Sequence, residues 1–290
     1  MRNTLETIPL HRKHKSRVFE MIFQDKEKLL ELYNAVNGTT YDNPDELEIN
    51  TLENAVYMSM HNDISFIIDF QLTLYEQQST YCPNMPLRFL DYVRDLYSDI
   101  TKNANLYGTK LVKIPTPHFV VFYNGEKECP DVMELKLSDA FIIPEEDPAL
   151  ELKAVMLNVN KGRNEKLMQA CKTLRDYAEY TYRVRLYAQT MDVESAVRKT
   201  IKECMENDIL AEFLHKNQAE AISMSIYEYD EKKHLQMERE DAREEGRKEG
   251  REEGRQEERA NTERERKRAD EAEAKLRELE KKLASFPSID

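Results

Sequence analysis

The chain has 290 residues, 56 of them acidic and 43 basic, and a net charge of −13. This length is enough for one large or two small domains with a hydrophobic core. The acidic balance argues against a protein whose whole surface binds nucleic acid, although a local basic face can act under a negative total. The four cysteines are scattered without a CxxC pair, which indicates free thiols in a cytoplasmic protein. The amino-terminal stretch has no apolar core, and no segment approaches ~20 apolar residues, so we expect no signal peptide and no membrane span.

The first third of the chain alternates between helical and extended patterns. Apolar residues recur at helical spacing from 18 to 38, and Gly38 is a natural end for that helix. An extended run follows over 47–60. Residues 62–79 contain two apolar runs separated only by Asp69-Phe70, which predicts a tight β-hairpin. Residues 87–101 have the pattern of an amphipathic helix that begins close to Pro86.

Two further strands are predicted at 118–125 and 150–160, ended by Asn-Gly and Lys-Gly pairs. Helices and strands mixed in this order indicate an α/β or α+β core, a mixed sheet flanked by helices, over residues 1–162. Residues 163–229 show helical periodicity with almost no breakers, which predicts a helical subdomain.

The last segment, 230–290, is rich in charge. Its EEGR-type tetrapeptides place Gly246, Gly250 and Gly254 along one stripe of a helix. Beyond them, apolar residues from Ala269 to Phe286 follow the 3-4 spacing of a short coiled-coil seam. The segment is interpreted either as a solvated charged tail or as a coil that joins copies of the chain into a homo-oligomer.

The predicted hairpin brings two carboxylates together. Pairing counted outward from the Asp69-Phe70 turn places Asp63 opposite Glu76, with Cβ atoms ~5 Å apart. Gln78, two residues beyond Glu76, points to the same face of the sheet. Like charges opposed across a strand pair destabilise it unless a cation lies between them. We therefore expect these residues to converge on one exposed face.

The residue types suggest a site for a hard cation. Mg²⁺ (or Mn²⁺) prefers oxygen ligands and is typically held by one or two carboxylates together with water and phosphate. Asp63 and Glu76 are the predicted ligands, and Gln78 would orient a water molecule or ligate through its amide oxygen. Such an ion supports phosphodiester hydrolysis. The alternative is an ordinary strand start and strand end with solvated side chains.

The run NDISFIIDFQLTLYEQQSTYCPNMPLRFLDYV resembles the Rpn family, the recombination-promoting nucleases or putative transposases of the PD-(D/E)XK nuclease superfamily. The resemblance extends to VFEMIFQDKEKLLELYNAVNG, to NLYGTKLVKIPTPHFVVFYNG, to LNVNKGRN and to the EEGR repeats. It implies a restriction-endonuclease-like fold, a Mg²⁺-dependent endonuclease activity and DNA as the partner. It also implies that Asp63, Glu76 and Gln78 are the catalytic residues.

The resemblance has departures. The position that matches the acid which the family often carries just before the first helix is Ser16 here. Glu20 is a possible auxiliary acid, or an exposed helix residue. Arg88 matches a family arginine and is a possible phosphate contact, or a solvated side chain. Two functions therefore stay open: a metal-dependent DNA endonuclease, and a catalytically inactive nuclease-fold protein that acts as an oligomerising or partner-binding module.

Overall fold

The computed structural model describes residues 18–49, residues 63–229 and Arg247. The chain divides into two units, 1–229 and 230–290, and the first contains all the elements described below. Three features named in the sequence analysis lie outside the described residues. They are Ser16, the glycine stripe and the coiled-coil seam. Among the described helices, none has both the length and the apolar character needed to cross a membrane.

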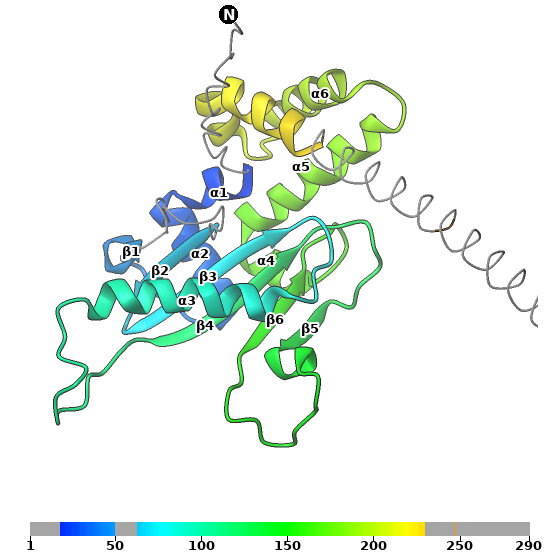
Figure 1. Cartoon of the computed structure of the whole chain (residues 1–290). Coiled ribbons are helices and arrows are strands. Elements are labelled where there is room, and N and C mark those ends of the chain that lie inside the picture. Colours follow the sequence, from blue (N-terminus) through cyan, green and yellow to red (C-terminus); the bar gives the residue numbers. More distant parts are fainter. Residues whose placement is uncertain (1–17, 50–62, 230–246, 248–290) are drawn as a thin grey trace, which may run out of the picture. The chain divides into compact units, whose positions relative to one another are not determined.

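The core of the first unit is a mixed sheet flanked by helices, as the sequence predicts (Figure 1). Within the described residues six strands lie in the order β1-β2-β3-β4-β6-β5. Strands β1, β2 and β3 are antiparallel, β3, β4 and β6 are parallel, and β5 returns antiparallel to β6. Their bounds are β1 Glu48–Ile49, β2 Ile64–Ile68, β3 Gln71–Gln78, β4 Thr116–Tyr123, β5 Val132–Lys136 and β6 Lys153–Asn158.

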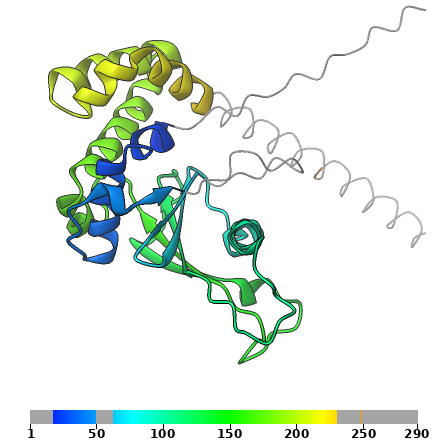
Figure 2. The ribbon, with the colours of Figure 1, turned by 90° about the vertical axis from the view of Figure 1, so that its left-hand side faces the viewer.

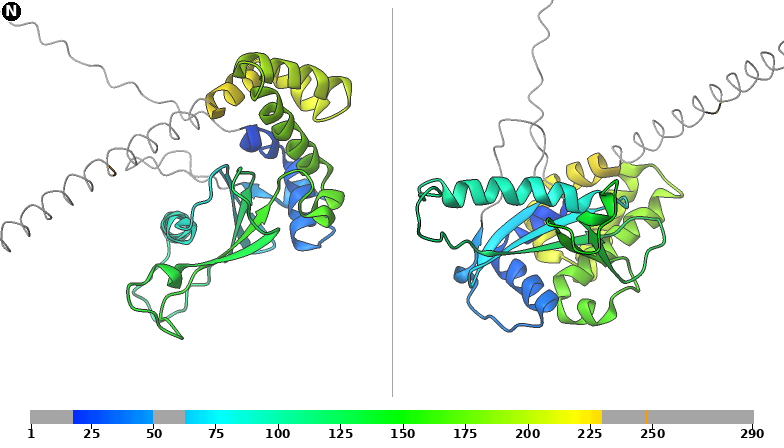
Figure 3. Two further views of the ribbon diagram at one scale, coloured as in Figure 1. Left: turned by 90° about the vertical axis from the view of Figure 1, so that its right-hand side faces the viewer. Right: turned by 60° about the horizontal axis from the view of Figure 1, so that its bottom comes forward.

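Helices cover both faces of the sheet. One face packs against α3, Met85–Thr101, through one apolar core. The opposite face packs against α1, Val18–Phe23, and α2, Lys26–Asn37, and against the helices that follow β6, through a second apolar core. Figure 2 shows α3 end-on, with the sheet between it and the other helices, and Figure 3 shows α3 lying along the sheet. The later helices are α4 Glu165–Ala170, α5 Lys172–Ala188, α6 Val193–Glu206 and the helical residues 211–229.

The structure differs from the sequence predictions in two details. The helix expected over 18–38 is two helices, because the Asp25 side chain accepts hydrogen bonds from two backbone N–H groups and caps α2 separately. Gly38 does end α2, with a positive φ of 66°. Strand β5 was not predicted, because it is an edge strand with mostly exposed side chains. All four cysteines are free thiols, as expected.

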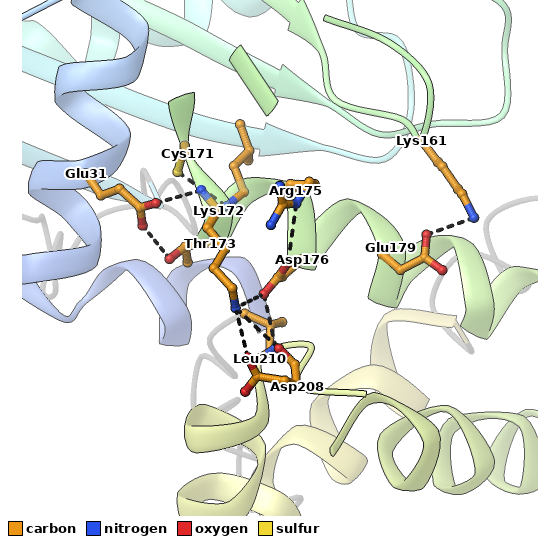
Figure 4. A network of polar contacts seen from close by, with 11 residues as sticks. Glu31, Lys161, Cys171, Lys172, Thr173, Arg175, Asp176, Glu179, Asp208 and Leu210 are labelled. Atoms are coloured by element: carbon orange, nitrogen blue, oxygen red, sulfur yellow. Dashed lines mark hydrogen bonds and ion pairs between the residues drawn. The ribbon is translucent and has the colours of Figure 1, made fainter. Parts of the chain in front are cut away.

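A polar network fastens α5 to α2 (Figure 4). The Glu31 carboxylate of α2 accepts hydrogen bonds from the Lys172 backbone N–H at 2.6 Å and from the Thr173 hydroxyl at 2.5 Å. The Cys171 sulfur accepts from the Leu174 N–H at 3.3 Å. Burial raises the pKa of the Cys171 thiol to about 12, so the thiol stays protonated and unreactive at neutral pH. Backbone N–H groups in the first turn of α5, which have no partner within the helix, thus donate to side chains.

The two-residue hairpin turn has the left-handed backbone conformation that is typical of tight hairpins. Asp69 and Phe70 have φ of 48° and 62°, as in a type I′ turn, whose twist matches that of the flanking strands. The pairs Ile64–Tyr75 and Ile68–Gln71 follow from this two-residue turn, so the predicted register is confirmed. The Phe70 side chain is 83 % exposed and holds this left-handed conformation without burial to compensate.

Phe70→Gly is therefore expected to stabilise the protein by about 1 kcal/mol, because glycine adopts positive φ without a steric cost. The matched control is Phe70→Ala, which removes the exposed ring but keeps the strained backbone. Thermal unfolding should give Phe70→Gly a melting temperature about 2–4 °C above that of the alanine variant. Equal melting temperatures would show that the turn is not strained.

Candidate active site

Asp63 and Glu76 face each other across the hairpin and are bonded reciprocally. The Asp63 backbone N–H donates to Glu76 Oε2 at 3.1 Å. In return, the Gln77 backbone N–H donates to Asp63 Oδ2 at 2.6 Å. Each carboxylate thus accepts from the backbone of the other's strand segment. This interlock fixes both side chains at the end of the sheet opposite the Asp69-Phe70 turn.

Glu76 and Gln78 lie on the face of β3 that α3 covers. They continue the row of Leu72 and Leu74, which point to the same face and belong to the core beneath α3, whereas Tyr75 points the other way and belongs to the opposite core. Glu76 is 2 % exposed and Gln78 is 8 % exposed, while Asp63 is half-buried. The expectation of one exposed face was therefore wrong, because the amino-terminal part of α3 lies over the end of the strand pair.

The positive charge beside the paired carboxylates comes from Arg88 of α3. Its Nη2 lies 2.6 Å from Glu76 Oε1, and the same nitrogen donates to the Tyr92 hydroxyl at 2.8 Å. The Gln78 amide nitrogen also donates to Glu76 Oε1, at 3.2 Å. Tyr92 is one helical turn beyond Arg88, so the helix itself places both groups beside Glu76.

The electrostatics favour a charged Arg88. Partial burial opposes its charge, but the neighbouring Glu76 carboxylate outweighs this and raises the pKa of Arg88 above its usual value. Burial, and then the negative charge of Glu76, raise the pKa of Tyr92 to about 12, so Tyr92 remains a neutral phenol. The Arg88 side chain is one-third exposed. It can therefore contact an anion that approaches from solvent while α3 stays in place.

The donor chemistry of this cluster suits a hard divalent cation in part. Two carboxylates and one amide provide oxygen atoms, which Mg²⁺ and Mn²⁺ prefer, and two carboxylates are enough where water and phosphate complete the shell. Across the described residues, no group of three or more His, Cys, Asp or Glu side chains is placed to hold a metal ion. Glu76 Oε1 also accepts from Arg88 and Gln78. An ion at Glu76 would thus compete with the guanidinium.

The possible auxiliary acid Glu20 lies on a different element. Glu20 is on α1, which packs on the sheet face opposite to that of Glu76, and its carboxylate accepts a 3.3 Å hydrogen bond from Gln24. The hydrogen bonds given above link Asp63, Gln78 and Arg88 to Glu76. Glu20 belongs to the helix layer that packs on the other face of the sheet.

A buried amide network behind the site was not predicted from the sequence. Gln77 points away from Glu76 and donates to Asn124 Oδ1 at 2.7 Å. Asn124 donates to the Tyr177 hydroxyl of α5 at 3.0 Å, and its carbonyl accepts from Arg185, also of α5. These bonds tie the end of β3 to the helical layer. In the sequence Asn124 looks only like a turn residue that ends a strand, so its buried amide gave no separate signal.

Gly125 allows the close packing of β3 and β4 at this end. A Cβ atom on Gly125 would lie 2.6 Å from the Ser79 carbonyl oxygen and 2.5 Å from the Tyr123 hydroxyl. Only glycine fits there without displacing backbone. The chain beyond Gln78 is thereby held against the end of β4, next to the carboxylate pair.

Comparisons with protein-family models, with curated proteins and with solved structures returned no match to this chain.

Proposed function

We propose that the chain is a metal-dependent DNA endonuclease of the PD-(D/E)XK type, related to the Rpn family that its sequence resembles. The observation that carries the proposal is the reciprocal pairing of Asp63 and Glu76, with Gln78 and Arg88 in contact with Glu76. The mixed sheet flanked by helices is compatible with this fold. DNA as the partner, a cytoplasmic location and a homo-oligomer formed through the tail are parts of the same proposal.

Each residue of the cluster has a role in phosphodiester hydrolysis. Asp63 and Glu76 would hold a Mg²⁺ or Mn²⁺ ion, which when bound polarises a phosphoryl oxygen and lowers the pKa of a coordinated water. Gln78 would orient the attacking water through its amide. Arg88 would turn from Glu76 to a non-bridging phosphate oxygen and stabilise the charge that develops there.

A second function is favoured by one observation. Glu76 is nearly fully buried and already engaged by Arg88, Gln78 and the Asp63 backbone. A buried ion pair of this kind can be a purely structural element. In that case the chain is an inactive nuclease fold that acts as an oligomerising or partner-binding module.

Incubation of the full chain with supercoiled plasmid separates the two functions. An endonuclease should convert supercoiled DNA to nicked or linear product in Mg²⁺ or Mn²⁺, and EDTA should stop the conversion. The control is the Asp45→Asn variant, which removes an exposed carboxylate from the 3-10 helix Pro44–Glu46, away from the cluster. DNA that stays intact in both ions would favour the inactive module.

A further inference from the structure

Two long loops project from the end of the sheet opposite the candidate active site (Figures 1 and 2). Residues 102–115 connect α3 to β4, and residues 141–152 connect the 3-10 helix Leu137–Ala140 to β6. Thr116, at the start of β4, pairs with Gln71 at the turn end of β3, and β6 runs parallel to β4. The two loops therefore leave the sheet at the same end.

Both loops expose large apolar side chains. In the first loop Leu106, Tyr107 and Leu111 are 63 %, 102 % and 82 % exposed. In the second, Ile142 and Ile143 are 100 % and 76 % exposed. Several large apolar side chains exposed on two loops that leave the sheet at the same end favour an interaction surface there. Their exposure also shows that the two loops do not cover each other within one chain.

The loops carry opposite charges. Lys110 and Lys113 are exposed, and the 102–115 loop has no acidic residue. Glu145, Glu146 and Asp147 are exposed, and the 141–152 loop has no basic residue. Each loop thus combines apolar side chains with one sign of charge. The loop of opposite charge is present on the same molecule.

We propose that this end of the sheet binds a second copy of the chain, with the 102–115 loop of each copy against the 141–152 loop of the other. A two-fold axis satisfies both loops at once, because each contact is then made twice. Opposite charges fix the pairing, and the apolar side chains supply the burial. A nucleic acid is a poorer occupant, because the acidic loop would repel it.

The proposal is independent of the proposed endonuclease function. It also differs from assembly through the tail, because the loops belong to the unit that ends at residue 229. In such a dimer the Asp63–Glu76 pairs lie at the ends of the two sheets that face away from the contact. Both candidate sites would stay open to a ligand.

Charge exchange between the loops tests the proposal on the full chain. Lys110→Glu with Lys113→Glu gives one variant, and Glu145→Lys with Glu146→Lys gives another. Each places like charges at both contacts, so sedimentation over a concentration series should show a dissociation constant raised at least ~10-fold. An equimolar mixture of the two variants pairs opposite charges again and should recover the wild-type affinity. A chain that carries all four substitutions should recover it as well.

The control variant is Lys166→Glu with Lys216→Glu, which reverses two exposed lysines on helices away from the loops and should associate like the wild type. All these side chains are exposed, so circular dichroism should show every variant folded. A wild-type chain that stays monomeric would overturn the proposal. So would association that is equal in wild type and both loop variants, which is the result expected of assembly through the tail alone.

Discussion

Glu76→Gln is expected to abolish divalent-dependent cleavage and to leave the fold intact. Glutamine keeps the volume of the side chain and can still accept a hydrogen bond from the Asp63 N–H, but it removes the charge that would hold the ion. A lost carboxylate ligand in a two-carboxylate site should lower the cleavage rate by at least ~10²–10³-fold, as for other single groups that stabilise transition-state charge. Asp63→Asn should have an effect of the same order.

The comparison that makes this test sharp is Glu76→Ala. Alanine leaves Arg88, Gln78 and the Asp63 N–H without their acceptor, so this variant should also lose about 1–3 kcal/mol of unfolding free energy. Glutamine should separate activity from stability, and alanine should remove both. Cleavage at the wild-type rate in Glu76→Gln and in Asp63→Asn would place the metal site elsewhere in the chain.

Arg88→Met is expected to have opposite effects on ion binding and on cleavage. The guanidinium occupies Glu76 Oε1 at 2.6 Å, so its removal frees an oxygen that the ion needs. Affinity for Mn²⁺ in the absence of DNA should therefore rise about tenfold, which corresponds to ~1.4 kcal/mol. Cleavage should fall ~10²-fold or more, because the group that would meet the phosphate is gone.

Calorimetric titration of Mn²⁺ into each variant measures the first effect without any reaction. Arg94→Met is the matched control: it lies on the same helix, is exposed, and pairs only with its neighbour Asp95 within the described chain. Arg88→Met should also melt at a lower temperature in EDTA, because Glu76 is then buried without its counter-charge. Weaker or unchanged Mn²⁺ binding would contradict the competition between Arg88 and the ion.

The sequence was sufficient to predict what depends on local chain geometry. A two-residue turn at Asp69-Phe70 determines the register of β2 and β3, and hence the approach of Asp63 to Glu76. The alternation of β3 then places Gln78 on the same face. The helical character of the residues after β6 and the end of α2 at Gly38 depend likewise on periodicity and backbone conformation.

Contacts between distant segments could not be predicted in the same way. No pattern in the sequence says which face of the sheet α3 covers, so the burial of Glu76 was missed. Arg88 was identified as a possible phosphate contact, but its pairing with Glu76 depends on how α3 packs. The buried amides of Gln77 and Asn124 were missed for a related reason: polar residues at strand ends usually form turns.

The mixed pairing of β3 has a consequence for the order in which the molecule folds. On one side β3 meets β2 across a two-residue turn, a contact that forms on the microsecond scale in isolated hairpins. On the other side it meets β4 in parallel, which requires closure of a connection that contains all of α3 and the loop after it. Long-range closure of this kind is slow, so β4 should join β3 later than β2 does.

We therefore expect the two carboxylates to come side by side early, as like charges in water, and their counter-cation to reach them only when α3 docks. Docking of α3 is then the step at which the repulsion between them is relieved, so mutations of Arg88 should slow that late step rather than the formation of the hairpin.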